Sequence, residues 1–129
     1  MKIANLLNSL SGAEDPKSLI ASNKVLQALI DFNFSEEKPF DLPEGFPEGR
    51  SLFMCETNLM QEGRRFYIFT KAGHPTLKRV KREQLFVDMC EGLCEEEARI
   101  LIAVKDQKLQ EMFPILLQLY PERKQNQIP

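Results

Sequence analysis

A cluster of positive side chains is the feature of this sequence that most strongly indicates a binding chemistry. Between residues 63 and 82 the chain has no Asp or Glu, yet it carries seven of its 17 basic residues there. These residues are Arg64, Arg65, Lys71, Lys78, Arg79, Lys81 and Arg82. Acidic residues gather at 36–48 and 88–97, and the formal net charge of the chain is −2. Such segregation predicts a local positive potential that attracts nucleic acid or an acidic protein surface.

Helical spacing indicates which of these charges act together. Lys78, Lys81 and Arg82 are three and four residues apart and therefore share one side of a helix, whereas Arg79 points elsewhere. An equally weighted alternative is a solvated helix face, partly neutralised by Glu83 and by the acidic segment before it. We take the seven basic residues as the candidate partner-binding surface.

Four side chains are potential zinc or disulfide partners: Cys55, Cys90, Cys94 and His74. Cys90 and Cys94 are spaced i, i+4 and could meet on a helix face, where His74 could join them as a third zinc ligand. These three scattered residues lack the tight paired spacing of a structural zinc site. An odd number of cysteines in a chain rich in core residues also argues against a disulfide framework. We expect reduced, buried thiols, no bound metal and no cofactor.

Familiar catalytic motifs are absent from the sequence. It contains no glycine-rich phosphate loop, no HExxH zinc motif and no GxSxG nucleophile motif. The single histidine, His74, lies in a Gly-His-Pro turn, where a loop residue in water is the commoner role. The three glutamates at 95–97 are explained by the favourable interaction of acids with a helix N-terminus. We therefore expect a protein that is not an enzyme.

Length and composition indicate one globular domain. A chain of 129 residues, 43% of them hydrophobic and 28% charged, is long enough to bury a core. No segment reaches the roughly 18 apolar residues of a membrane span, and the first residues lack the pattern of a secretion signal. We expect a cytoplasmic protein with a single helical domain at 1–121 and a disordered tail at 122–129.

Apolar spacing predicts an all-α fold, a compact bundle of about five to six helices. The expected helices are 3–10, 16–33, 58–70, 77–92, 95–109 and a last one beginning near Pro114. Asp15 followed by Pro16 is a strong helix start signal. In helix 77–92 we expect an inward face made of Val80, Gln84, Phe86 or Val87, and Met89 to Leu93. The nearly continuous apolar run ARILIAV makes 95–109 the expected central helix.

One long loop interrupts the helices at 35–51, where three prolines and two glycines exclude a helix or a central strand. Phe40, Leu42 and Phe46 are expected to pin this loop across the helices, with a partner-binding edge as the weaker alternative. A minor β-element near 52–56 is also possible.

Three segments carry a resemblance to known proteins: DLPEGFPEG, NLMQEGRRFYIF and LKRVKREQLFVDMCEGLCEEEARILIAVKDQKL. Over roughly residues 40–113 the chain resembles a group of small proteins encoded by T-even-like tailed bacteriophages. One protein of about this size in those phages binds the host RNA polymerase core, so the resemblance implies polymerase as the partner and modulation of transcription as the function. It assigns no binding residues.

A nucleic-acid-binding accessory of phage replication or transcription is the alternative function. Phe66, Tyr67 and Phe69 near the arginines would suit stacking on single-stranded bases, although aromatic residues at helical spacing more often belong to the core.

Overall fold

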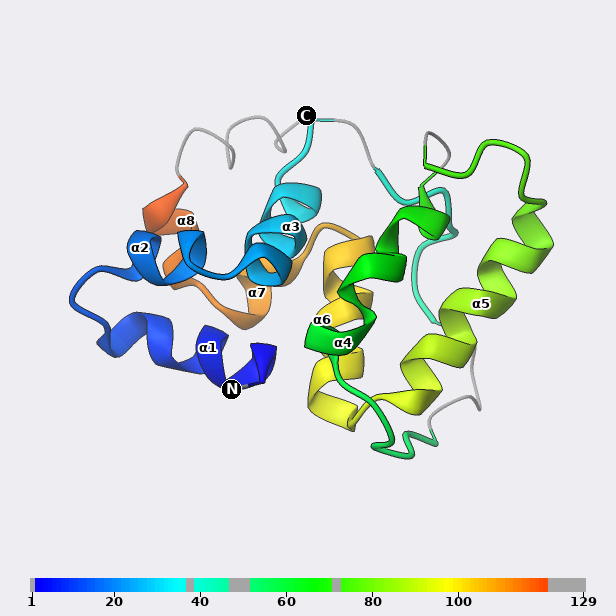
Figure 1. The fold of residues 1–129 in the computed structure, drawn as a ribbon. Coiled ribbons are helices and arrows are strands. Elements are labelled where there is room, and N and C mark those ends of the chain that lie inside the picture. The colour runs from blue at the N-terminus through cyan, green and yellow to red at the C-terminus, as the bar shows by residue number, and fades with distance from the viewer. Residues whose placement is uncertain (1, 37–38, 47–51, 71–72, 121–129) are drawn as a thin grey trace.

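Short helices make up most of the computed structural model, which describes residues 2–36, 39–46, 52–70 and 73–120 (Figure 1). The α-helices within these ranges are α1 (Ile3–Ser9), α2 (Pro16–Ala21), α3 (Lys24–Asn33), α4 (Leu59–Glu62), α5 (Arg79–Gly92), α6 (Glu95–Lys105), α7 (Leu109–Met112) and α8 (Ile115–Leu119). Two 3-10 helices, η1 (Leu10–Gly12) and η2 (Gly63–Phe69), extend α1 and α4.

The mainly helical fold class is confirmed, with more and shorter helices than the five to six expected. The described residues form no sheet, only single bridges between Phe40 and Thr70 and between Thr57 and Leu93. Residues 52–56, where a β-element was considered, form neither a strand nor a bridge; the nearest bridge is at Thr57. None of the described helices combines the length and apolar character needed to cross a membrane. The tail predicted at 122–129 lies outside the described residues.

The single helix expected over 16–33 is wrong, because the chain breaks between α2 and α3. The predicted start is present, since the Asp15 side chain accepts a hydrogen bond from the backbone N–H of Ser18. Asn23 then begins a second helix, with its side chain accepting from the N–H of Leu26 at 3.0 Å. Asn competes well for such capping positions and poorly for helix interiors, which explains a break that apolar spacing alone does not show.

Helix α6 lies at the centre of the molecule, as its apolar run predicts. It packs against α1, α3, α5 and α7, and the side chains of Ile100, Leu101 and Val104 are fully buried (Figure 1). Helix α2 packs on α3 and η1 instead, and α8 packs on α7.

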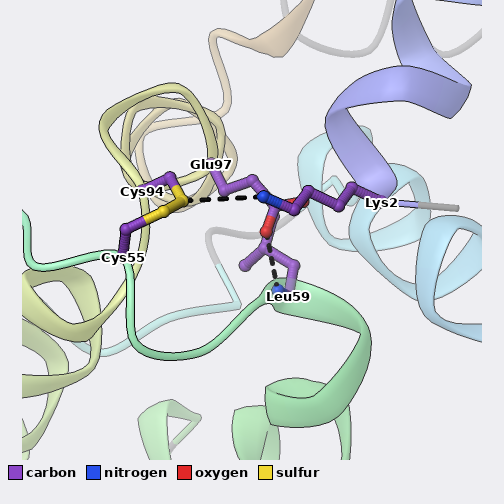
Figure 2. The surroundings of a disulfide bond; sticks show 5 residues. All are labelled: Lys2, Cys55, Leu59, Cys94 and Glu97. Atoms are coloured by element: carbon purple, nitrogen blue, oxygen red, sulfur yellow. Dashed lines mark hydrogen bonds between the residues drawn. A yellow bond between two sulfur atoms is a disulfide. The ribbon is translucent and has the colours of Figure 1, made fainter.

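A buried carboxylate joins three helix N-termini at one end of α6. Glu97 is 1% exposed; its Oε1 accepts the N–H of Leu59 at 3.0 Å and its Oε2 accepts the N–H of Ala4 at 3.3 Å. Figure 2 shows the bond to Leu59. Both N–H groups lie in first helical turns, of α4 and α1, where the backbone has no acceptor of its own. One side chain therefore satisfies donors from two other helices.

The loop residues Phe40 and Leu42 are buried, and Phe46 is partly buried against the core. Phe40 packs on Phe69 with ring centroids 5.8 Å apart, and on Phe86 at 6.5 Å. The loop is therefore pinned across the helices as predicted, and the alternative of a partner-binding edge is wrong for Phe40 and Leu42.

The predicted helix over 58–70 forms as α4 followed by η2, and Gly63 lies at the change from one to the other. A Cβ atom at Gly63 would lie 2.7 Å from Cγ2 of Val25, so a side chain there would overlap α3. Glycine is required at this position because two helices approach closely.

We predict that Gly63→Ala lowers the free energy of unfolding by about 1–3 kcal/mol, because the added methyl group overpacks the contact with the stiff Val25 side chain. Urea unfolding measures this directly. Gly12→Ala is the control and should not destabilise the protein, because a Cβ atom added at Gly12 would meet no other atom within 4 Å. Equal effects of the two substitutions would contradict the close approach of α3 and η2.

We also predict that Glu97→Gln destabilises the protein by about 1–3 kcal/mol, because the amide keeps one acceptor but turns a donor toward the second buried N–H. The matched control is Glu96→Gln, at the preceding residue of the same helix turn. Glu96 is exposed and accepts a hydrogen bond from Asn8 Nδ2, so this substitution should change the free energy of unfolding by no more than about 0.5 kcal/mol. Unchanged stability of Glu97→Gln in urea would refute the role of this carboxylate.

Candidate partner-binding surface

The structure distributes the seven predicted basic residues over different environments. Arg64, Arg65, Lys78, Arg79 and Lys81 are exposed, Arg82 is buried, and Lys71 lies outside the described residues. Arg64 and Arg65 belong to η2, whereas Lys78, Arg79, Lys81 and Arg82 lie at the beginning of α5. These two elements pack against each other. The predicted surface therefore exists in part, without Arg82.

The prediction that Arg82 contributes to the surface is wrong, because its side chain is 2% exposed and fully used inside the protein. Its Nη1 donates to Asp41 Oδ2 at 2.6 Å, its Nε to the carbonyl of Ile68 at 3.1 Å and its Nη2 to the carbonyl of His74 at 2.8 Å. A guanidinium suits this place because its donors form a rigid planar fork that can serve several acceptors at once.

The first half of α5 also differs from the prediction. Val80 and Gln84, expected inside, are exposed, and Val80 is 78% exposed. Phe86 and Met89 are buried as expected. The hydrophobicity of the helix residues places the Arg82 side chain on the solvent side. Its burial is explained only by the acceptors that other parts of the chain bring to it.

A second buried cation fastens the same loop. Lys105, in the last turn of α6, donates from Nζ to the carbonyl of Pro43 at 2.8 Å and pairs with Asp106. Its ammonium also lies 5.8 Å from the centroid of the Phe86 ring. Arg82 and Lys105 thus hold residues 41–43 from two helices, which explains how a loop rich in proline and glycine keeps its place.

Acidic neighbours neutralise some of the exposed charges. Arg65 pairs with Glu62 at 3.4 Å, and Arg79 lies 3.7 Å from Glu83 and 4.0 Å from Asp41. The predicted neutralisation by Glu83 and by the acidic loop is confirmed for Arg79. Arg64, Lys78 and Lys81 form no ion pair with any residue that the structure describes.

The beginning of α5 is unusual electrostatically. Lys78 occupies the N-cap without a side-chain capping bond, Arg79 and Lys81 follow in the first turn, and that turn contains no acid. Cations at the positive end of a helix dipole oppose helix formation by about 0.3–1 kcal/mol each. Helix stability therefore does not explain why positively charged residues occupy the beginning of α5. We call Lys78, Arg79, Val80 and Lys81 the α5 cationic surface.

The aromatic residues near the arginines are divided between core and surface. Phe66 and Phe69 are buried, as their helical spacing predicts, and Tyr67 is 53% exposed. A stacking platform for single-stranded bases would need several exposed rings in a row. Here one exposed ring is present on η2.

A groove of about 410 Å³ is lined by residues 56–57, by the junction of α4 and η2, and by α5. Its lining includes three carboxylates, of which Glu62 pairs with Arg65 and Asp88 accepts from Nε2 of Gln84 at 2.8 Å. The hydroxyl of Thr57 donates to Gln61 rather than to one of these acids. The groove thus presents no paired nucleophile and base.

The matches to known proteins are limited to one family. A model described as "Family of unknown function (DUF6433)" matches residues 17–111. The chain belongs to this family. The matched range runs from the second residue of α2 into α7 and includes the whole α5 cationic surface. No curated protein and no solved structure matches this chain.

Two features of the structure are not apparent from the sequence. The expectation of reduced thiols is wrong for Cys55 and Cys94, which form a disulfide across 39 residues of sequence. No local pattern pairs cysteines that far apart. The role of Glu97 is also hidden, since an acid in a first helical turn is already explained by the dipole. Its position directly before an apolar run is the one signal that it lies close to the core.

We predict that Arg82→Ala destabilises the protein by about 3–5 kcal/mol, because it leaves Asp41 and two carbonyl groups without their buried donor. Lys81→Ala, one residue earlier on α5, is the matched control and should change the free energy of unfolding by no more than about 0.5 kcal/mol. Thermal and urea unfolding compare the two variants. Similar stability of both would show that Arg82 belongs to the surface after all.

Proposed function

We propose that this chain is a non-enzymatic, phage-encoded protein that binds the core of bacterial RNA polymerase in the host cytoplasm and modulates transcription. The observation that carries the proposal is the α5 cationic surface, whose charges oppose the helix that displays them. Resemblance to small proteins of T-even-like phages supports the choice of polymerase as the partner. The resemblance assigns no binding residues; these are proposed from the charge pattern of the sequence and from the exposure that the structure gives each side chain.

The composition of the α5 cationic surface suits an acidic protein. Val80 is largely exposed between Lys78, Arg79 and Lys81, so an apolar contact is surrounded by positive charges. Protein interfaces commonly combine an apolar centre with a polar rim. Complementary charge at the rim accelerates association and selects the partner more than it adds affinity. Arg64 on η2 extends the positive charge to the neighbouring element.

Direct binding of nucleic acid is supported less well. Asp41 and Glu83 lie beside Arg79, where they would repel a phosphate backbone. Tyr67 supplies one exposed ring, whereas its neighbours Phe66 and Phe69 belong to the core. These features favour a folded acidic partner over a strand of phosphates.

We predict opposite effects on stability and binding when Lys78→Asp and Lys81→Glu are combined. An acid at the N-cap and another three residues later form a capping pair and favour the helix dipole, so the variant should be more stable by about 1 kcal/mol. Retention of polymerase should nevertheless fall at least tenfold. Loss of binding could then not be ascribed to unfolding.

The matched control is Lys17→Glu with Lys24→Glu, which reverses two exposed cations in the first turns of α2 and α3. Both double variants have the same net charge. Figure 1 shows α2 at the end of the molecule far from α5, and α3 separated from α5 by α4 and α6. The control should retain polymerase like the wild type. Equal losses in both variants would mean that total charge, and not the α5 cationic surface, governs binding.

The partner is identified by retention from bacterial lysate on the tagged protein, with and without nuclease and at low and high salt. Stoichiometric RNA polymerase core that survives nuclease is the expected result. Recovery of nucleic acid alone, lost steeply as salt rises, would replace the proposal by direct phosphate binding.

A further inference from the structure

The disulfide between Cys55 and Cys94 joins an extended segment to the beginning of α6 (Figure 2). The Cα atoms of the two residues are 4.0 Å apart. Residues 52–57 precede α4, and Cys94 is the N-cap residue of α6. The bond therefore lies next to Leu59 and Glu97, whose hydrogen bond connects the same two parts of the chain.

The two sulfur atoms have different surroundings. Cys55 is exposed and its backbone has a φ of 57°, whereas Cys94 is half-buried at the N-terminus of an eleven-residue helix. The ammonium of Lys2 lies 3.7 Å from the Cys94 sulfur, and Figure 2 shows its side chain extended toward it. A helix N-terminus and a nearby cation both stabilise a thiolate, so Cys94 is the better leaving group and Cys55 the more accessible target.

The acidic residues in the first turn of α6 all have hydrogen-bond or ion-pair partners other than the sulfur atoms. Glu95 pairs with Arg99 at 2.9 Å, and Glu96 accepts from Asn8 Nδ2 at 2.9 Å. Glu97 accepts the two backbone N–H groups described above. Lys2 is thus the charged group hydrogen-bonded to the sulfur.

We propose that Cys55 and Cys94 form a thiol–disulfide exchange site for low-molecular-weight thiols of the glutathione class. A small thiolate attacks the Cys55 sulfur and forms a mixed disulfide there, while the Cys55–Cys94 bond breaks and its electron pair leaves on Cys94 as a thiolate. A second small thiolate attacks the sulfur of the first, forms the small-molecule disulfide and releases the Cys55 thiolate. Two electrons pass from two small thiols to the protein, and their two protons are taken up by the cysteine thiolates.

Breaking the bond leaves segment 52–57 attached to the protein. The N–H of Met54 donates to the carbonyl of Glu91 at 2.8 Å, and those of Glu56 and Thr57 donate to the carbonyl of Gly92 at 2.8 and 3.0 Å. These bonds to the end of α5 do not involve the sulfur atoms. The reduced protein therefore keeps its fold, and the site can be reoxidised by the reverse exchange.

The third cysteine does not compete for this chemistry. Cys90 is fully buried in α5, and burial raises the pKa of its thiol to about 12. At neutral pH it stays protonated and out of reach of small reagents. It serves as an internal marker of unfolding, because it reacts only when the core opens.

The test treats the folded protein with reduced glutathione, stops exchange with acid and locates glutathione by peptide mass spectrometry. The expected result is a transient mixed disulfide on Cys55, followed by free thiols at Cys55 and Cys94, with Cys90 unmodified throughout. Glutathione on Cys94 instead, a bond inert until denaturant is added, or simultaneous reaction of all three cysteines would each overturn the proposal.

Two variants make the assignment sharper. After reduction, Cys94→Ser exposed to oxidised glutathione should keep glutathione on Cys55, because the resolving thiol is missing, whereas the reduced wild type should return to the internal disulfide. Lys2→Gln should slow reduction of the bond by roughly two- to fivefold, with Lys17→Gln as the control without effect. Unchanged kinetics in Lys2→Gln would remove Lys2 from the site.

Discussion

The carboxylate of Glu97 is the interaction on which the arrangement of the helices depends. Short helices such as α1 and α4 are marginal alone, and their first N–H groups need acceptors from elsewhere. Glu97 provides two of these acceptors from the first turn of the central helix, in a buried position. Because a buried carboxylate is costly without hydrogen bonds, the three helix N-termini and the charge stabilise one another. Helices α3, α5 and α7 also pack against α6, so the position of α6 constrains theirs.

Cations serve two separate purposes in this protein. Arg82 and Lys105 are buried and hold the loop at 41–43, where they meet a carboxylate and backbone carbonyls. Lys78 and Lys81 remain in solvent at the start of α5, where they weaken the helix. A cationic group that stabilises the fold and one that opposes it can be adjacent in sequence. This contrast separates structural residues from candidate binding residues without reference to any relative.

The sequence was a good guide wherever local signals and burial agree. The Asp15-Pro16 start, the apolar run of α6 and the aromatic pins of the loop all formed as expected, since each follows from one element and its own pattern. The predictions failed where a residue far away in the sequence determined the position of a side chain. Arg82 turns inward because carbonyls of Ile68 and His74 meet it there, and Cys55 finds Cys94 across 39 residues. Asn23 split a helix because a side-chain cap outweighed continuous apolar spacing. For the function, charge segregation located the region, but only the structure removed Arg82 from it.

The most direct test of a binding role for the start of α5 is amide hydrogen exchange of the protein with and without its retained partner. The N–H groups of residues 79–81 have no helical acceptor, since the first bond of α5 runs from Arg82 to the carbonyl of Lys78. They should exchange quickly in the free protein. The account predicts that the partner slows exchange at these amides and leaves α2 and α3 unchanged. Slower exchange in α2 and α3, with no change at 79–81, would contradict it.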